Sequence, residues 1–232
     1  MADNPYAESY RNALFYGHYW DIQSAYGGAL SSVVLQVYFP QTEAQAREAG
    51  ANDSSPYFAP LSVAEVAHVQ WFLGQVASFA NLTFQTVTNP VNALPQLYLY
   101  KRDLGANTTS GLGELPIPAL FSNPDKQAFA VIDAGPGSNI PNADYANHVL
   151  SHEILHTLGL KHPWDASTNF YPNGPTGQIV SGAHSTAYTL MAYDEPYARA
   201  DVNGDGFAYD ALPIASASVF DIAALQQAYG AN

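Results

Sequence analysis

The chain has 232 residues, with 20 acidic against 7 basic side chains and a formal net charge of −13. Such a charge argues against a protein that binds nucleic acid or an anionic membrane surface by electrostatic attraction. Hydrophobic residues make up 47% of the chain, which is enough for a sizeable core. No apolar run reaches the roughly 20 residues needed to cross a bilayer. The length fits one domain or a small unit of two subdomains.

The elements expected in chain order begin with a strand and a long helix. Residues 33–39 are apolar and end at Pro40, which predicts a buried strand. Residues 41–57 are polar and rich in alanine, and they fit either a loop or a short helix. Residues 60–80 repeat apolar side chains near a period of 3.6, which predicts an amphipathic helix with Ser62 as its cap. Further strands are expected at 82–88, 96–101 and 128–133, long loops at 103–126 and 163–187, and helices at 144–159 and 216–229.

The stretch HEILHTLGLKH, which begins at His152, carries most of the functional signal. His152 and His156 lie one helical turn apart on the same face, so both imidazoles can bind one zinc ion. Glu153 between them can act as a general base, and Gly159 permits a left-handed turn that brings His162 to the same metal. Three histidines leave a fourth position open for water, which is the arrangement of catalytic zinc. The alternative is a helix with two solvent-facing histidines and a third in a loop.

A methionine follows this motif in the segment YTLMAY, residues 188–193. Together with the histidine motif, the segment resembles the Met-turn of the metzincin metallopeptidases. The resemblance implies that Met191 does not bind zinc but packs below the three imidazoles as a soft apolar base. Taken alone, the segment also fits the end of an apolar strand with a buried methionine.

Three further features resemble the serralysin family of secreted bacterial metallopeptidases. Pro163 follows His162, the Met-turn reads Met-x-Tyr with Tyr193 as the tyrosine, and the chain ends FDIAALQQAYGAN, like the last helix of serralysin catalytic domains. The resemblance implies that Tyr193 can bind zinc in the resting enzyme and then turn away to hydrogen-bond the reaction oxyanion. Because the chain has 16 tyrosines, an ordinary core tyrosine is the alternative.

The resemblance also implies an α+β, metzincin-like fold. We expect a twisted mixed five-stranded sheet with two long helices, a zinc cleft, and a smaller irregular C-terminal subdomain that ends in a helix. Residues 1–232 would form a single metallopeptidase catalytic domain, with an N-terminal subdomain at about 1–159 and a C-terminal subdomain at about 160–232. A peptide substrate would pair with an edge strand, which we place at 129–132, and an internal strand is the alternative there.

The sequence departs from the serralysin pattern inside the zinc helix and at its end. Leu155 and Thr157 stand where the family has glycine and alanine. Because both face away from the metal, we expect altered packing and an intact site. The sequence ends at Asn232, where the family continues into calcium-binding nonapeptide repeats and a secretion signal, so this part is either lost or outside this sequence.

The compartment is expected from the same resemblance. Residues 1–30 show no signal peptide, and the absence of cysteine excludes disulfides and a zymogen blocked by a cysteine thiolate. Both observations agree with the serralysin type of export. We therefore expect a secreted, extracellular bacterial protein, and we expect it to be a monomer.

A second metal site is indicated by the segment DVNGDG. Asp201, Asn203 and Asp205 stand at positions 1, 3 and 5 of a loop that resembles the first half of an EF-hand. Oxygen atoms at these positions converge on a hard cation, and the glycine at position 6 permits the sharp turn. Position 12 is Leu212, where a glutamate is expected. The segment predicts a candidate calcium site, with a hydrated turn as the alternative.

These residues together predict a secreted zinc-dependent endopeptidase that hydrolyses peptide bonds of protein or peptide substrates. Zinc would lower the pKa of its bound water toward about 7, Glu153 would take the water proton, and Tyr193 would help to stabilise the oxyanion. His148 lies four residues before His152 and is a candidate supporting group. The histidines without such a context are expected to be structural or on the surface: His18, His68 and His184.

Two other classes of function stay open. One is a catalytically silent metzincin-fold binding module, against which the intact Glu153 argues. The other is a zinc hydrolase that acts on an amide other than a peptide bond. Neither nucleic acid nor a membrane is expected as a partner of any of the three.

Overall fold

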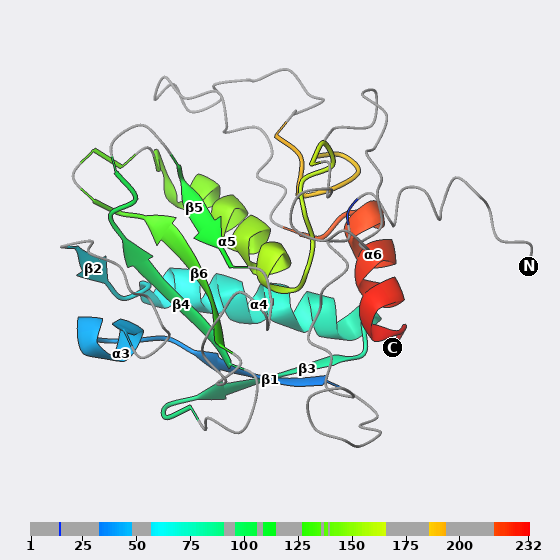
Figure 1. The fold of residues 1–232 in the computed structure, drawn as a ribbon, viewed down its shortest axis with the longest axis horizontal. Helices are drawn as coiled ribbons and strands as arrows, with labels where there is room; N and C mark the ends of the chain where they lie inside the picture. The colour runs from blue at the N-terminus through cyan, green and yellow to red at the C-terminus, as the bar shows by residue number, and fades with distance from the viewer. Residues whose placement is uncertain are drawn as a thin grey trace, which may run out of the picture.

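The computed structural model describes residue 14 and residues 33–47, 57–90, 96–105, 109–114, 127–135, 137–138, 140–165, 186–193 and 216–232. Within these residues, two long helices cover one face of a mixed β-sheet, and another helix closes the chain (Figure 1).

The sheet of the described residues has six strands, four of them parallel and two antiparallel. Along the chain they are β1 (Val33–Tyr38), β2 (Phe58–Ala59), β3 (Leu82–Val87), β4 (Gln96–Arg102), β5 (Gly111–Gly113) and β6 (Gln127–Asp133). Their order across the sheet is β3-β1-β4-β6-β5, and β2 pairs with the end of β4. The two antiparallel strands are the short ones, β2 and β5.

Side chains of β4 alternate between the two faces of the sheet, since successive residues of a strand point to opposite sides. Leu97 and Leu99 belong to the large cluster under the long helices, whereas Tyr98 and Tyr100 belong to a smaller cluster on the other face. The short helix α3 (Glu43–Arg47) contributes a buried alanine to that smaller cluster. With both faces covered, β4 is apolar along most of its length, as parallel strands usually are.

Helix α4 (Val63–Phe79) begins with a capping box, as expected from Ser62. The Ser62 hydroxyl accepts the N–H of Glu65 at 3.3 Å, and the Glu65 carboxylate accepts the N–H of Ser62 at 2.6 Å. The same carboxylate forms an ion pair with Lys101 Nζ at 2.7 Å, which ties the start of α4 to β4. The buried stripe of the helix consists mainly of Val69, Phe72, Leu73 and Val76.

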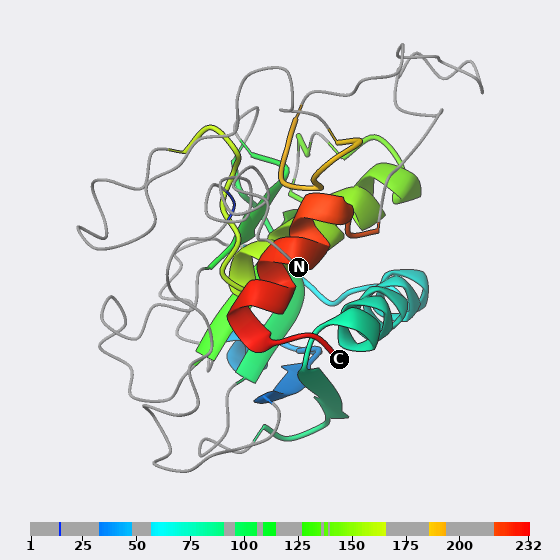
Figure 2. The ribbon, with the colours of Figure 1, turned by 90° about the vertical axis from the view of Figure 1, so that its right-hand side faces the viewer.

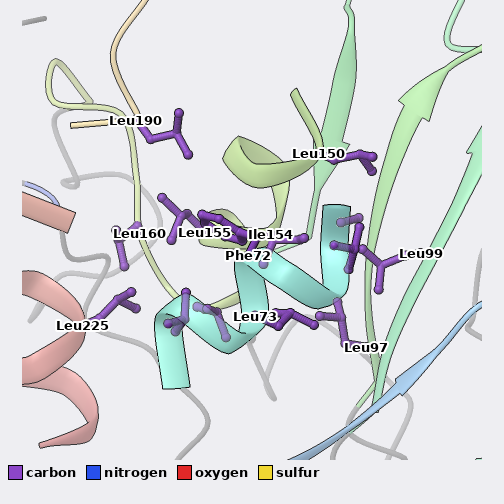
Figure 3. Packing of buried hydrophobic residues seen from close by; sticks show 14 of the residues in the cluster. Phe72, Leu73, Leu97, Leu99, Leu150, Ile154, Leu155, Leu160, Leu190 and Leu225 are labelled. Atoms are coloured by element: carbon purple, nitrogen blue, oxygen red, sulfur yellow. The ribbon is translucent and has the colours of Figure 1, made fainter. Parts of the chain in front are cut away.

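Helix α5 (Ala143–Thr157) contains most of the histidine motif. It begins at Asn142, whose side chain accepts the N–H of Tyr145 at 2.8 Å. It ends just before Gly159, whose φ of 96° would strain any residue with a Cβ. Figure 3 shows the apolar side chains that α5 and the following turn contribute to the core: Leu150, Ile154, Leu155 and Leu160.

Helix α6 (Val219–Tyr229) lies beside the ends of helices α4 and α5 (Figures 1 and 2). The Gln226 side chain donates to the carbonyl oxygen of Phe79 at the end of α4, at 2.9 Å. The Tyr229 hydroxyl donates to the carbonyl oxygen of Leu158 at the end of α5, also at 2.9 Å. The last helix therefore holds the C-terminal ends of α4 and α5 together.

The edge of the sheet differs from the expectation. Within the described residues there are six strands instead of five, and the prediction of an uninterrupted loop over 103–126 is wrong at β5. Residues 129–132 are internal, because β6 pairs with β4 on one side and with β5 on the other. The sequence Gly-Leu-Gly has no strand pattern of its own. Its place is set by how closely a glycine backbone can approach α5.

The other predicted helices and strands are confirmed, with ends that shift by up to three residues. Most of the predicted loop at 163–187 lies outside the described residues. The α+β class, the mixed sheet, the two long helices and the closing helix are all present. The division of a single domain into subdomains near residue 159 stays a prediction. Among the residues with an assigned structure, no helix is long and apolar enough to cross a membrane.

Gly113 offers a test of the close approach between β5 and α5. A Cβ at this position would lie 2.3 Å from the carbonyl oxygen of Glu153 and 2.8 Å from His156 Cβ, so Gly113→Ala must push the strand away from the helix. We expect the free energy of unfolding in urea to fall by about 1–3 kcal/mol. Gly74→Ala is the matched control, because nothing lies within 4 Å of its Cβ. It should stabilise α4 by about 0.5–1 kcal/mol. Equal effects of the two substitutions would contradict the close approach.

Candidate metal centre

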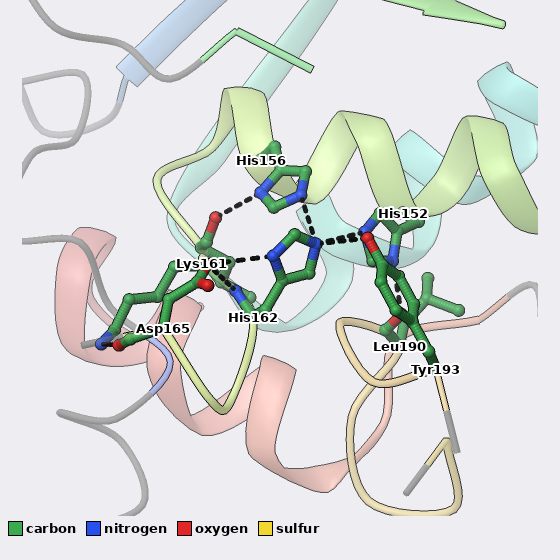
Figure 4. A network of polar contacts seen from close by, with 8 residues as sticks. His152, His156, Lys161, His162, Asp165, Leu190 and Tyr193 are labelled. Carbon is green, nitrogen blue, oxygen red and sulfur yellow. Dashed lines mark hydrogen bonds and ion pairs between the residues drawn. The ribbon is translucent and has the colours of Figure 1, made fainter. Parts of the chain in front are cut away.

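Three histidine side chains meet at one point of the structure (Figure 4). His162 Nε2 lies 3.3 Å from His152 Nε2 and 3.2 Å from His156 Nε2. The three candidate ligand atoms all lie within 4.8 Å of one another. Tetrahedral zinc with Zn–N bonds of about 2.0–2.1 Å places two nitrogens about 3.3–3.4 Å apart. The spacing therefore fits a zinc ion held by three imidazoles.

Two of the imidazoles are oriented by carbonyl oxygens on their other ring nitrogen. His152 Nδ1 lies 2.8 Å from the carbonyl oxygen of Leu190, and His156 Nδ1 lies 2.8 Å from that of Leu160. A carbonyl oxygen only accepts, so Nδ1 carries the proton and Nε2 keeps a lone pair. Such partners fix the tautomer and the ring orientation of metal-binding histidines.

Asp165 gives the third histidine a carboxylate partner. Its Oδ2 lies 2.9 Å from His162 Nδ1 and accepts the backbone N–H of His162 at 3.3 Å. The N–H of Asp165 in turn donates to the carbonyl oxygen of His162 at 3.1 Å, and the Lys161 ammonium donates to the carbonyl oxygen of Asp165. These bonds make residues 161–165 a tight turn that presents the His162 ring to the other two.

Burial keeps the imidazoles of α5 uncharged. His152 is 4% exposed, and burial, together with the neighbouring His156, holds its pKa well below the usual value. Burial and the nearby His162 lower the pKa of His156 to about 4. Metal ions bind the neutral form of imidazole, so these two rings are ready to bind at neutral pH. The alternative of two solvent-facing histidines is wrong.

The carbonyl group that orients His152 belongs to a tight turn around Met191. The N–H of Ala192 donates to the carbonyl oxygen of Thr189 at 3.2 Å and closes this turn, as expected for residues 188–193. Met191 is fully buried and belongs to the main core cluster. Its role as a base beneath the metal stays a prediction.

Asp221 of α6 holds this turn in place. It is fully buried, and its carboxylate accepts the Thr189 hydroxyl at 2.5 Å and the backbone N–H groups of Leu190 and Ser218 at 2.8 and 2.9 Å. Burial raises the pKa of Asp221 to about 6, against the opposite effect of these donors. Since the Leu190 carbonyl binds His152, α6 positions the first histidine through one residue of the turn.

Glu153 lies next to the histidines, on the side of α5 that faces β5. Its side chain is 7% exposed, and burial raises its pKa to about 8, against a hydrogen bond from the backbone of Gly113. A nearby cation would lower this pKa again, which suits a group that takes up a proton near neutral pH. Glu153 lines a pocket of about 290 Å³ between β5 and α5, together with Thr109, Ser110, Gly111, Tyr145, His148, Val149, His152 and Tyr193.

The hydroxyl of Tyr193 lies 2.7 Å from His162 Nε2, the atom that faces the other two imidazoles. Its ring stacks on that of His152, with centroids 5.5 Å apart. Desolvation and the Glu153 carboxylate raise the pKa of Tyr193 to about 12, so the phenol is a hydrogen-bond donor at neutral pH. The side chain is 62% exposed, and the alternative of an ordinary core tyrosine is wrong.

Comparison with known proteins agrees with the geometry, because relatives of the chain include serralysins. No family model matches the chain. Serralysin A of Dickeya chrysanthemi is 29% identical over 187 residues, which are 78% of this chain and 36% of that protein. Serralysin G of the same organism is 27% identical over 218 residues, 92% of this chain and 42% of that protein. A serralysin of Photorhabdus sp. (strain Az29) is 37% identical over 91 residues, 38% of this chain and 17% of that protein.

The chain is thus similar to serralysin-type metzincins, at 27–29% identity over most of its length and 37% over a shorter stretch. It spans about two fifths of the length of Serralysins A and G, 36% and 42% respectively. Solved structures to which it is similar include a hatching-enzyme zinc-protease from Oryzias latipes, at 12% identity and a TM-score of 0.43, covering 88% of this chain and 93% of that chain. A likeness this loose supports no conclusion of its own.

The remaining predicted residues divide into two groups. His148 lines the pocket, with its ring centroid 6.4 Å from that of His152, so its candidate supporting role stays a prediction. His68 is half-buried, with its Nε2 2.8 Å from Ser151 Oγ, as expected for a structural histidine. Several predicted positions lie outside the described residues: His18, His184 and the candidate calcium residues Asp201, Asn203 and Asp205.

Sequence reasoning missed two carboxylates of this metal centre, Asp165 and Asp221. Asp165 lies three residues after His162, and this spacing is the signal that could have found it, since side chains this close along a turn often meet. Asp221 had no such local signal. It lies 31 residues beyond Leu190 and reaches the turn only because α6 folds back against it.

Removing the Asp165 carboxylate should weaken zinc binding. Without its acceptor, the His162 ring loses the partner that fixes its tautomer and direction, so we expect Asp165→Ala to lower zinc affinity about 10- to 100-fold. Asp165→Asn keeps an acceptor oxygen and should lose less. The measurement is competition with a chromophoric chelator, and Asp144→Ala, an exposed acid at the start of α5, is the control. Equal zinc affinities of wild type and Asp165→Ala would contradict the role of Asp165.

Asp221 should make the free energy of unfolding of the metal-free protein, kept so by a chelator, depend on pH. Its pKa is 3.8 in the unfolded chain and about 6 in the folded one, so the folded state binds the proton more strongly. Stability from this group is fully present below about pH 4 and is lost as pH rises to about 6, by roughly 2–3 kcal/mol. Asn does not titrate, so the gap in unfolding free energy between wild type and Asp221→Asn should narrow from pH 4 to pH 6. A gap that widens would mean that the three donors outweigh burial.

Proposed function

We propose that this chain is a zinc-dependent endopeptidase domain that hydrolyses peptide bonds of protein or peptide substrates. The observation that carries the proposal is the convergence of three imidazole nitrogens beside a pocket, which His152 and the buried carboxyl group of Glu153 line. A structural zinc site would use a fourth protein ligand and would have no need of a proton acceptor beside it. Similarity to serralysins supports the same reaction.

His152, His156 and His162 would hold the zinc ion. When bound, zinc supplies Lewis acidity and lowers the pKa of water toward about 7. The neutral state of the two imidazoles of α5 and the bonds on Nδ1 keep the three rings directed at one point before any metal arrives. The chain therefore needs little rearrangement to bind the ion.

Glu153 would act as the general base and then as the acid. Its carboxyl group faces the pocket next to the histidines, and burial places its pKa close to neutrality. It can accept the proton of the attacking water and return it to the nitrogen of the leaving amine. The bond from Gly113 would hold the carboxylate toward the pocket while the proton moves.

Tyr193 would stabilise the charge that develops on the substrate oxygen. Its hydroxyl is protonated and lies at the histidine cluster, so it can donate a hydrogen bond to an oxyanion there. A donor aimed at the charge of the transition state lowers the barrier more than one that binds the ground state. Binding of zinc by Tyr193 in the resting protein is the other role that the resemblance implies.

The substrate would lie along β5. In the described part of the chain, β5 pairs with β6 on one side, and a peptide could add to its other side by main-chain hydrogen bonds. The pocket beside Glu153 would then take one side chain of that peptide. This placement supports an extended polypeptide substrate over a small amide. Secretion, the monomeric state and calcium binding at Asp201, Asn203 and Asp205 stay predictions from the sequence.

The decisive test combines metal content with peptide cleavage. The wild-type protein should bind one zinc ion and cleave casein or a fluorogenic peptide, and 1,10-phenanthroline should abolish cleavage. Glu153→Gln should keep its zinc and lose about 100- to 10,000-fold in kcat/KM, because only the proton transfer is removed. Glu43→Gln, an exposed glutamate of α3, is the matched control and should keep full activity. Zinc binding without cleavage of any polypeptide would favour the silent binding module.

A further inference from the structure

Trp164 occupies an unusual position among the aromatic rings of the metal centre. Its indole lies parallel to the His162 imidazole, with centroids 4.9 Å apart and an interplanar angle of 3°. The same indole lies 4.8 Å from the ring of Tyr193, at 57°. Since Tyr193 is itself 5.0 Å from His162, the three rings are in mutual contact.

The backbone that carries Trp164 is firmly held. Trp164 lies inside the turn closed by the hydrogen bond from the N–H of Asp165 to the carbonyl oxygen of His162. The preceding Pro163 is buried, and the Asp165 carboxylate binds both the backbone and the ring of His162. The turn therefore fixes the backbone of Trp164, and the stacking on His162 gives its indole a contact that does not involve Tyr193.

Tyr193 is much less constrained. Its side chain is 62% exposed, and its hydroxyl bonds to His162 Nε2. That nitrogen lone pair is the one that a metal ion would take, so this hydrogen bond is lost when the site is loaded. Among the described residues, the ring contacts of the phenol with His152, His162 and Trp164 remain.

We propose that Trp164 is a positioning residue that holds the Tyr193 phenol against the histidine cluster and so determines how its hydroxyl is presented to the substrate. The functional part of this inference rests on the peptidase activity proposed above, whereas the ring contact does not. His162 is already fixed by Asp165, so the indole has its main effect on Tyr193. An aromatic contact of this kind changes an equilibrium roughly threefold to tenfold.

The ring contact can be tested in the metal-free protein. Trp164→Ala, Tyr193→Ala and the double variant form a double-mutant cycle on the equilibrium constant of unfolding, measured in urea with a chelator present. We expect the effect of Trp164→Ala to be roughly threefold to tenfold smaller in the Tyr193→Ala background. Trp71→Ala is the control, because this indole lies on α4 against His68, and its effect should be the same in both backgrounds. Strict additivity for Trp164 would overturn the proposal.

The functional consequence requires the zinc-loaded enzyme. Trp164→Ala should lower kcat roughly threefold to tenfold with little change in KM, and Trp164→Phe, which keeps a ring, should restore most of the loss. In a Tyr193→Phe background, which has no hydroxyl to position, Trp164→Ala should cause no further loss of kcat. A raised KM that persists in this background would show direct substrate contact, and a persistent loss of kcat would show action through His162. Either result overturns the proposal. Coupling in the metal-free cycle without any peptidase activity would instead reject the proposed function.

Discussion

The metal centre depends on one electrostatic constraint: three ring nitrogens must face one point inside the protein without carrying protons. Each Nδ1 meets this constraint by donating to an oxygen, and the three oxygens come from three different places along the chain. Leu160 follows α5, Asp165 lies in the next turn, and Leu190 lies in the turn around Met191. A shift of any one of these acceptors would release a ring and remove a lone pair from the common point.

This constraint explains what the later part of the described chain does. The glycine after α5 reverses the chain so that Leu160 can reach back to His156 and His162 can face both rings of the helix. Asp221 then fixes Leu190, and α6 is in turn bonded to the ends of α4 and α5. The turn around Met191, which has no regular secondary structure, is thus attached to the helices through the Asp221 side chain. The positions of the metal-site residues are therefore fixed by the packed core that Figure 3 shows.

The contribution of the sequence follows from how local each feature is. The spacing of His152, Glu153 and His156 depends only on helical periodicity, and Gly159 only on backbone sterics, so both could be predicted. The edge strand could not, because two glycines and a leucine have no strand preference, and their pairing depends on the surface of α5. Asp221 could not either, since its partners are distant in sequence. The candidate calcium loop lies outside the described residues, so that prediction is neither supported nor opposed.

Helix α5 links stability and chemistry in one element. One face buries Leu150, Ile154 and Leu155 in the core, and the opposite face carries the histidines and Glu153. Burial of the apolar face fixes the helix, and burial of the opposite face keeps the imidazoles neutral and moves the pKa of Glu153 toward neutrality. The environment that makes these groups useful is costly for any ion formed there without a partner. A divalent cation would relieve that cost for the carboxylate, so binding the metal should both complete the site and stabilise the fold.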